Sequence, residues 1–388
     1  MRERTDTLAV SLRPSATSAR TPNAVAPVVW ALVAVLLLVA ACRSGPSRET
    51  PPEAALDLEP AYGDAIIEGS IGDASNLIPM LAGDSSSHEV AALVFDGLVA
   101  YDPTLSFLEP RLASSWEVSD DGLEITFHLR RDVRWQDGRP FSARDIEYGF
   151  NTIIAPGTLT AYAEDYRQVE SFTLMGEHDF KVRYREPFAP ALASWGNLVV
   201  LPRHLLAGGD INEAADFSRN PVGLGAYRLQ SWETARSITL LANHDYYRGR
   251  PYIEKVVYQV IPDLQTQFLE LKSGGIDMMG LTPLQFSRQT SSSEFERNFA
   301  KYRYLTNSYT YLGYNLRNPL FQDVKVRHAL SHAIDKDEIV RAVLLGLGRA
   351  AKGPYKPGTV WANREVEDLA FDPDRARRLL DEAGWSDS

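Results

Sequence analysis

Residues 116–138 contain the pattern that most restricts the fold, a strict alternation of apolar and polar side chains. The apolar positions are Leu123, Ile125, Phe127 and Leu129, and the polar positions are Glu124, Thr126, His128 and Arg130. A period of two predicts strands that bury one face. The Asp-Gly pairs at 121–122 and 137–138 are typical of hairpin turns. We therefore expect an antiparallel meander in this segment.

Helical patterns adjoin this meander and recur along the chain. Ser142 stands three residues before Asp145, which is the spacing of a capping box, and apolar side chains occupy helical intervals after it. Residues 88–103 carry apolar side chains on one helical face as far as Leu98. Residues 254–280 have the pattern of a strand, a helix, a glycine stop and a second strand, which is a βαβ unit. Strands that alternate with helices predict a mixed α/β fold.

Two more segments predict local structure. The glycine-rich stretch 220–227 precedes a strand rather than a helix, so we interpret it as a turn with positive φ and not as a phosphate-binding loop. Residues 308–317 predict a tyrosine-rich strand, and the apolar pattern after it predicts two helices joined near Asp335.

The first 41 residues have the layout of a secretory leader. Four arginines precede the uncharged stretch 21–42, which ends in small residues. Pro27 shortens the uninterrupted apolar run to about 14 residues, a length that suits a leader better than a membrane span. We predict a signal peptide over residues 1–41, and a permanent span is the alternative.

Cys42 is the only cysteine of the chain, which excludes an internal disulfide. The tetrapeptide Val39-Ala40-Ala41-Cys42 resembles the lipobox of bacterial lipoproteins. This resemblance implies a diacylglyceryl group on the Cys42 sulfur, cleavage before Cys42 and acylation of the new amino terminus. Several acyl chains on one residue anchor a protein stably. An unreactive cysteine directly after a leader is the alternative interpretation.

Composition and charge restrict the part of the chain after the leader. Residues 42–61 are rich in Pro, Ser and charge, and predict a flexible tether that carries the lipidated cysteine. The chain has a net charge of −11, which gives no electrostatic footprint for nucleic acid. A body of about 330 residues after the tether exceeds what one hydrophobic core usually serves, so we expect two lobes.

We find no catalytic constellation, no metal site and no cofactor motif in the sequence. His328 and His332 have the spacing of metal ligands on a helix, but Ala329 stands where a zinc peptidase needs Glu, and no third ligand is evident. Turn chemistry explains the carboxylate pair Asp120-Asp121. There is no Gly-x-Ser-x-Gly elbow, so a peptidase is the disfavoured alternative and we predict that the protein is not an enzyme.

Four blocks in order resemble one family, the solute-binding proteins of bacterial ABC importers for oligopeptides, dipeptides, nickel and some sugars, called family 5. These blocks are residues 111–146, 221–227, 313–340 and 371–385. The resemblance extends from about Ala65 to Trp385. It implies a mixed α/β, two-lobed fold of the type II periplasmic-binding-protein class (Venus flytrap), in which two lobes close on a ligand and an extra subdomain is inserted.

This resemblance also implies domain boundaries. The expected divisions are 62–104 for the first part of lobe I, 105–219 for the inserted subdomain, 220–304 for the second part of lobe I and 305–388 for lobe II. Members of the family continue past the last block, whereas this sequence ends at Ser388. We therefore expect a truncated chain with an incomplete second lobe, which lacks the acidic group that pairs with the ligand's amino terminus in peptide binders.

The function implied by the resemblance is that of a lipid-anchored receptor in the cell envelope, facing the periplasm or the cell exterior. It captures a peptide and delivers it to the permease and ATPase of an importer, and we expect it to be a monomer. The candidate ligand-binding residues, by match to the family pattern, are Gly72, Asp73, Ser75, Tyr162, Tyr311, Tyr314 and Asn315. The alternative for each is a structural role, either shaping a turn or packing in a core.

Three other functions remain open. The same fold binds nickel chelates or oligosaccharides in other members of the family. A surface lipoprotein without a role in transport is the second alternative. A non-functional truncated product is the third.

Overall fold

The computed structural model describes residues 8–12, 60–103, 105, 107–196, 198–306 and 308–386. Cys42, the predicted tether up to residue 59 and most of the predicted leader lie outside the described residues. Among the described residues, no helix combines the length and the apolar composition that a bilayer crossing requires.

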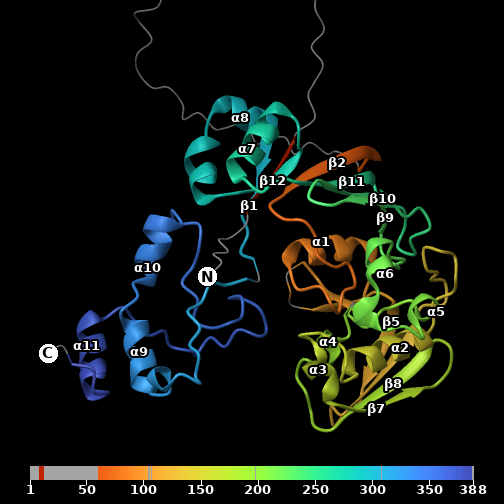
Figure 1. Cartoon of the computed structure of the whole chain (residues 1–388), viewed down its shortest axis with the longest axis horizontal. Helices are drawn as coiled ribbons and strands as arrows, with labels where there is room; N and C mark the ends of the chain where they lie inside the picture. Colours follow the sequence, from red (N-terminus) through yellow and green to blue (C-terminus); the bar gives the residue numbers. More distant parts are fainter. Residues whose placement is uncertain are drawn as a thin grey trace, which may run out of the picture. The chain divides into compact units, whose positions relative to one another are not determined.

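The largest sheet has seven strands in the order β13-β1-β12-β2-β11-β10-β9 (Figure 1). These strands are β1 (Leu8–Leu12), β2 (Gly63–Ser70), β9 (Tyr227–Glu233), β10 (Ser237–Ala242), β11 (Ile253–Val260), β12 (Met278–Leu281) and β13 (Phe299–Lys301). β2 runs parallel to both β11 and β12. Helix α7 (Leu264–Ser273) connects β11 to β12, which confirms the βαβ unit predicted for residues 254–280.

β1 comes from a segment that lies within the predicted leader. It pairs antiparallel with β12 on one side and with β13 on the other, so that Val10 is opposite both Met279 and Lys301. A strand from the segment predicted to be a leader therefore lies between β12 and β13.

Helix α1 (Ser85–Val94) packs against this sheet through Val90 and Val94, which are buried with Leu240 and Tyr258. The helix was expected to continue to Leu98, but it ends at Val94, because Phe95 has an extended backbone conformation. The carbonyl of Val94 accepts the backbone N–H of Gly225 at 2.8 Å instead of continuing the helical ladder.

The glycine-rich stretch 220–227 supplies this contact. A Cβ on Gly223 would lie 1.8 Å from the carbonyl oxygen of Val94, and a Cβ on Gly225 would lie 2.4 Å from that of Leu93. Neither glycine has a positive φ. The prediction of a positive-φ turn is therefore wrong at these two positions, where glycine instead permits the close approach of two backbones.

A second sheet has four antiparallel strands in the order β5-β6-β8-β7. They are β5 (Ala113–Val118), β6 (Glu124–Leu129), β7 (Val169–Leu174) and β8 (Asp179–Tyr184). β5 and β6 form the first hairpin of the predicted meander, and β6 buries Ile125, Phe127 and Leu129 as the alternation predicts. The second turn, at residues 137–138, joins no further strand of this sheet and closes only an isolated bridge between Arg134 and Pro140. On its other side β6 pairs with β8, and between these two strands the chain forms two helices and β7.

Helix α2 (Ala143–Ile154) covers one face of this sheet with Ile146, Phe150 and Ile153 (Figure 1). The side chain of Asp145 accepts the backbone N–H of Ser142 at 2.9 Å, which confirms the predicted capping box. Short helices complete the unit: α3 (Ala163–Arg167), α4 (Ala191–Ser194), α5 (Arg203–Leu206), the 3₁₀ turn η1 (Ile211–Glu213) and α6 (Ala215–Arg219). The two-stranded ribbon of β3 (Val99–Tyr101) and β4 (Leu108–Pro110) precedes β5.

The remaining elements are helical. They are η2 (Gln285–Gln289), α8 (Ser293–Asn298), η3 (Pro319–Phe321), α9 (Val324–His332), α10 (Lys336–Glu338), η4 (Ile339–Val343) and α11 (Pro373–Glu382). The helices α9 and α10 meet at Asp335, whose side chain accepts the backbone N–H of Glu338. The tyrosine-rich strand predicted for residues 308–317 is not formed, because the described backbone there pairs with no neighbouring strand.

Candidate functional site

The loop that joins β2 to α1 contains three of the predicted ligand-binding residues: Gly72, Asp73 and Ser75. They lie together because β2 ends at Ser70 and α1 begins at Ser85. Gly72 donates its backbone N–H to the side chain of Ser70, whose hydroxyl donates in turn to the Gly72 carbonyl at 2.7 Å. These bonds fold the start of the loop into a tight turn.

Asp73 has partners for both of its carboxylate oxygens. Its Oδ1 accepts the indole N–H of Trp232 at 2.8 Å, and its Oδ2 accepts the backbone N–H of Ala235 at 2.7 Å. The guanidinium of Arg219 lies 3.7 Å from the centre of the Trp232 ring. Asp73 thereby ties the loop to the β9–β10 hairpin, which is a structural role.

Ser75 belongs to the network that caps α1. Its hydroxyl donates to Asp84 Oδ2 at 2.5 Å, and its backbone N–H donates to the hydroxyl of Ser87 at 2.8 Å. Asp84 also accepts the backbone N–H of Ser87 at 2.8 Å. Burial raises the pKa of Asp84, but the hydrogen bonds from Ser75 and Ser87 outweigh it and hold the pKa below its ordinary value.

Tyr162 reaches the same region from the segment before α3. It is the residue before α3, and its hydroxyl lies 3.2 Å from the carbonyl oxygen of Ala82 and 3.0 Å from His88 Nε2 on α1. Thr160 adds a hydrogen bond from its hydroxyl to the carbonyl of Met80 at 2.6 Å. The structure therefore brings Tyr162 next to the segment between the β2–α1 loop and α1.

The other three predicted residues, Tyr311, Tyr314 and Asn315, belong to the segment 308–318. Their side chains contact residues that are close to them in sequence. Tyr311 is 73% exposed, and its ring lies 5.5 Å from that of Tyr309, centre to centre. Tyr314 packs on Phe321, and Asn315 Oδ1 accepts the backbone N–H of Arg317. Among the described residues, no hydrogen bond joins these three side chains to the β2–α1 loop, so their role in ligand binding stays a prediction.

Glu68 is a residue that sequence reasoning missed. It lies on β2 opposite Tyr258 of β11, and it is half-buried. Burial and the nearby carboxylate of Glu89 raise the pKa of Glu68 to about 7. The sequence signal that could have identified Glu68 is a single carboxylate inside the apolar run of a central strand.

A second missed feature joins distant parts of the chain. The indole N–H of Trp361 donates to the hydroxyl of Tyr101 at 3.0 Å, across 260 residues of sequence. Tyr101 ends β3, and Trp361 belongs to the long connection between η4 and α11. Neither residue stands out in a single sequence, because each is an isolated aromatic in a stretch without periodicity.

His328 and His332 differ in environment although they are four residues apart. His332 is 8% exposed, and its Nδ1 lies 2.6 Å from the carbonyl oxygen of Ala370, whereas His328 is exposed. Within the described ranges, no group of three or more His, Cys, Asp or Glu side chains has the arrangement that a metal ion requires.

Comparison with known proteins gives one family model that matches residues 108–388, described as the middle part of bacterial extracellular solute-binding proteins, family 5. The oligopeptide-binding protein AppA of Bacillus subtilis is 28% identical over 367 residues, which are 92% of this chain and 66% of AppA. The chain thus spans slightly less than two thirds of this relative.

Solved structures agree with the sequence match. AppA of B. subtilis in complex with a nonapeptide has a TM-score of 0.73 at 26% identity, over 85% of this chain and 66% of that one. NikZ of Campylobacter jejuni in complex with Ni(L-His) has a TM-score of 0.72 at 28% identity, over 82% of this chain and 63% of that one. These neighbours confirm the predicted mixed α/β fold of the type II periplasmic-binding-protein class.

Proposed function

Because this chain belongs to the bacterial extracellular solute-binding proteins of family 5, we propose that it is the receptor of an ABC importer for oligo- or dipeptides. In this proposal it captures a peptide between two lobes, and the binding free energy favours the closed state that a membrane permease recognises. No bond is made or broken. The observation that carries the proposal is the family match over residues 108–388.

Peptide specificity is supported by the ligands of the similar proteins. The neighbour AppA was solved with a nonapeptide, and DppA of Helicobacter pylori, with a TM-score of 0.71, was solved with the peptide STSA. Peptides are held largely through backbone hydrogen bonds, with side chains in wet pockets, so one site accepts many sequences. We assign the ligand contacts to two groups of residues. The first group is Gly72, Ser75 and Tyr162, and the second is Tyr311, Tyr314 and Asn315.

Glu68 adds an electrostatic element to this assignment. A half-buried carboxylate with a pKa of about 7 is stabilised in its charged form when a cation lies beside it. A basic side chain of the peptide is such a cation. Asp73 has both carboxylate oxygens in hydrogen bonds, so it acts in this scheme by fixing the loop rather than by direct contact.

Titration calorimetry on the full chain tests the proposal, with a nonapeptide and a tripeptide of mixed sequence as probes. We expect saturable binding of at least one peptide, and the Tyr311→Ala, Asp73→Ala double variant is expected to lose at least tenfold in affinity. Tyr62→Ala is the matched control, because Tyr62 is also exposed but packs on Tyr252 beside the start of β2. Intact affinity in the double variant would make the site assignment wrong.

Nickel is the second candidate ligand, and the likeness to NikZ with its Ni(L-His) complex favours it. Calorimetry with Ni²⁺ and L-histidine on the same chain distinguishes the two. If the nickel complex bound and neither peptide did, the ligand assigned to the receptor would be a metal chelate and not a peptide. The proposed role as a receptor would be unchanged.

The lipid anchor is part of the same proposal. We assign acylation to Cys42, which would hold the receptor on the membrane, facing the periplasm or the cell exterior, beside the permease and ATPase. Expression in bacteria fed an alkyne-bearing fatty acid tests this step. The label is expected on the wild-type chain and not on Cys42→Ser, and equal labelling of both would contradict it.

A further inference from the structure

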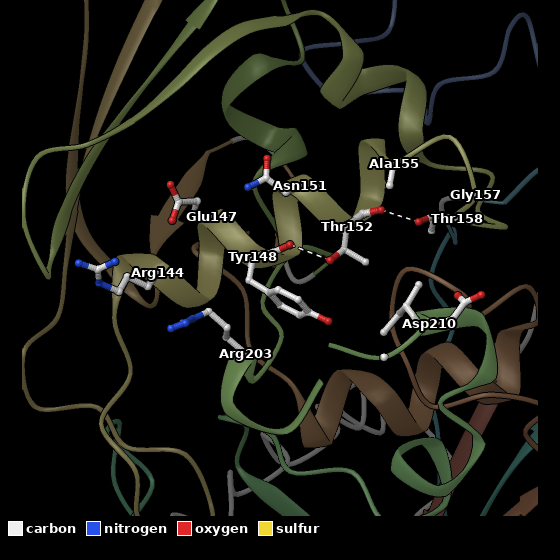
Figure 2. Close-up of a pocket in the computed structure, with 12 residues that line it drawn as sticks. Arg144, Glu147, Tyr148, Asn151, Thr152, Ala155, Gly157, Thr158, Arg203 and Asp210 are labelled. Carbon is white, nitrogen blue, oxygen red and sulfur yellow. Dashed lines mark hydrogen bonds between the residues drawn. The ribbon is translucent and has the colours of Figure 1, made fainter. Parts of the chain in front are cut away.

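The inserted subdomain contains a pocket that lies apart from the residues assigned to peptide contact. Its volume is about 580 Å³, which is within the range of small-molecule sites. One wall is a face of α2, with Arg144, Glu147, Tyr148 and Asn151 at helical spacing. The opposite wall is formed by Arg203 and Asp210 (Figure 2).

This wall of α2 is held in place by the other side of the helix. Ile146, Phe150 and Ile153 are buried in the core, and a Cβ on Gly149 would lie 1.9 Å from the carbonyl oxygen of Val199. Such close packing fixes the position of α2 against the core. This wall of the pocket is therefore preformed, which favours ligand binding because little ordering of α2 is needed on association.

The internal hydrogen bonds of the pocket use mainly its uncharged groups. The hydroxyl of Thr158 donates to the carbonyl of Thr152, and Asn212 donates to the carbonyl of Gly157 at 2.9 Å. Asp210 Oδ1 accepts both the backbone and the side-chain N–H of Asn212. These bonds fix the loops that border the pocket.

Among the described residues, the side chains of Arg144, Arg203 and Glu147 have no hydrogen-bond or ion-pair partner, although all three line the pocket. Figure 2 shows both guanidinium groups at the end of the pocket opposite Asp210, with Glu147 at that same end and the Tyr148 ring directed toward the middle. Two guanidinium groups and one carboxylate make this end cationic by one charge, and Asp210 at the other end makes the charged residues that line the pocket neutral in total.

The chemistry of these groups defines the ligand. A guanidinium group binds carboxylate or phosphate through two parallel N–H bonds. The excess of positive charge at this end favours a ligand with a single acidic group, because Glu147 repels a second one. The Tyr148 ring offers an apolar surface for the body of the ligand, and Asn151 offers a hydrogen-bonding amide. Burial raises the pKa of the Tyr148 phenol, so it stays a neutral hydroxyl at neutral pH.

We propose that this pocket is a second binding site, separate from the peptide site, for a small organic anion that carries one carboxylate or phosphate group on a hydroxyl-bearing body. Arg144 and Arg203 bind the anionic group, and Tyr148 and Asn151 contact the rest of the molecule. The proposal does not depend on which solute the receptor transports.

Titration calorimetry on the full chain tests the proposal with three probes: gluconate, glucose 6-phosphate and inorganic phosphate. We expect saturable binding of gluconate or glucose 6-phosphate. Weaker binding of inorganic phosphate is expected, because it lacks the hydroxyl-bearing body that Tyr148 and Asn151 contact. Equal or tighter binding of inorganic phosphate would overturn the assignment of an organic ligand, and the absence of saturable heat with all three probes would overturn the site.

Single variants assign the site. Arg144→Gln and Arg203→Gln are each expected to weaken binding by about tenfold or more, since each removes a charge-assisted pair of hydrogen bonds. Arg131→Gln is the matched control, because Arg131 is exposed in the same subdomain and does not line the pocket. Binding that is unchanged in the Arg144→Gln, Arg203→Gln double variant would place any anion elsewhere. Circular dichroism checks that each variant is folded, which we expect because both arginines are exposed.

Discussion

Asp73 accepts the indole N–H of Trp232 at 2.8 Å, and through this bond the β2–α1 loop is fixed to the β9–β10 hairpin. The second carboxylate oxygen accepts the backbone N–H of Ala235. The loop that we assign to ligand binding is thus held by a tryptophan 159 positions away in sequence from Asp73. Its geometry depends on the hairpin before any ligand arrives.

The first prediction concerns this bond. Asp73→Asn replaces one acceptor oxygen by an amide donor that faces another N–H, so it is expected to lower the free energy of unfolding by about 1–2 kcal/mol. Urea denaturation measures this difference. Asp64→Asn is the control, since Asp64 is exposed on β2, and an equal loss in both variants would contradict the structural role of Asp73.

The second prediction concerns the glycine-rich stretch. Gly223→Ala places a methyl group against the carbonyl oxygen of Val94 and is expected to destabilise the protein by about 3 kcal/mol, because backbone must shift. Gly176→Ala is the matched control, as a Cβ there meets nothing within 4 Å. Thermal unfolding compares the two. A small effect at Gly223 would show that the contact with α1 is not rigid.

The elements that local interactions determine could be predicted from the sequence. The elements that depend on residues far along the chain could not. The β5–β6 hairpin and the capping box at Ser142 belong to the first kind, because alternation and local hydrogen bonds determine them within a few residues. The end of α1 belongs to the second kind, because the partner that takes the Val94 carbonyl is Gly225, far along the chain.

The candidate site shows the same division. The sequence indicated Gly72, Asp73 and Ser75 as a loop, and the structure finds them in one. No local pattern indicated that Trp232 would take the Asp73 carboxylate or that Glu68 would be half-buried near Glu89, since both depend on how strands and helices pack. The tyrosine-rich strand was predicted from propensity alone, and a strand needs a pairing partner as well.

The third prediction is a pH dependence. The pKa of Glu68 is about 7 in the folded protein and near 4.5 when unfolded, so the folded state favours the protonated form. The stability that this provides is fully present below pH 4.5 and is lost as the pH rises through 7. Glu68→Gln is expected to remove this loss and to be more stable than the wild type at pH 8 by an amount on the order of 2 kcal/mol.

Urea denaturation at pH 5 and pH 8 measures this effect. Glu296→Gln serves as the control, because Glu296 is exposed on α8. If wild type and Glu68→Gln lost the same stability between the two pH values, the raised pKa would be wrong.

The fourth prediction concerns β1. A chain that begins at Cys42 lacks the strand between β12 and β13, so the backbone N–H groups that it pairs lose their partners. Hydrogen exchange is expected to be at least about tenfold faster in residues 278–281 and 299–301 of that chain than in the full chain. Exchange in β10, which pairs with β9 and β11, is the internal control. Unchanged exchange in β12 would show that β1 contributes nothing to the sheet.

The position of β1 also bears on the order of events after synthesis. Residues 8–12 belong to the segment that we predict to be a signal peptide, and in the folded chain they are hydrogen-bonded to strands on both sides. For a chain that is exported through this signal peptide, we expect translocation to begin before β1 has paired with β12 and β13. Pairing of β1 in the sheet and recognition of the same residues as a signal peptide would then exclude each other, because one segment cannot do both at once.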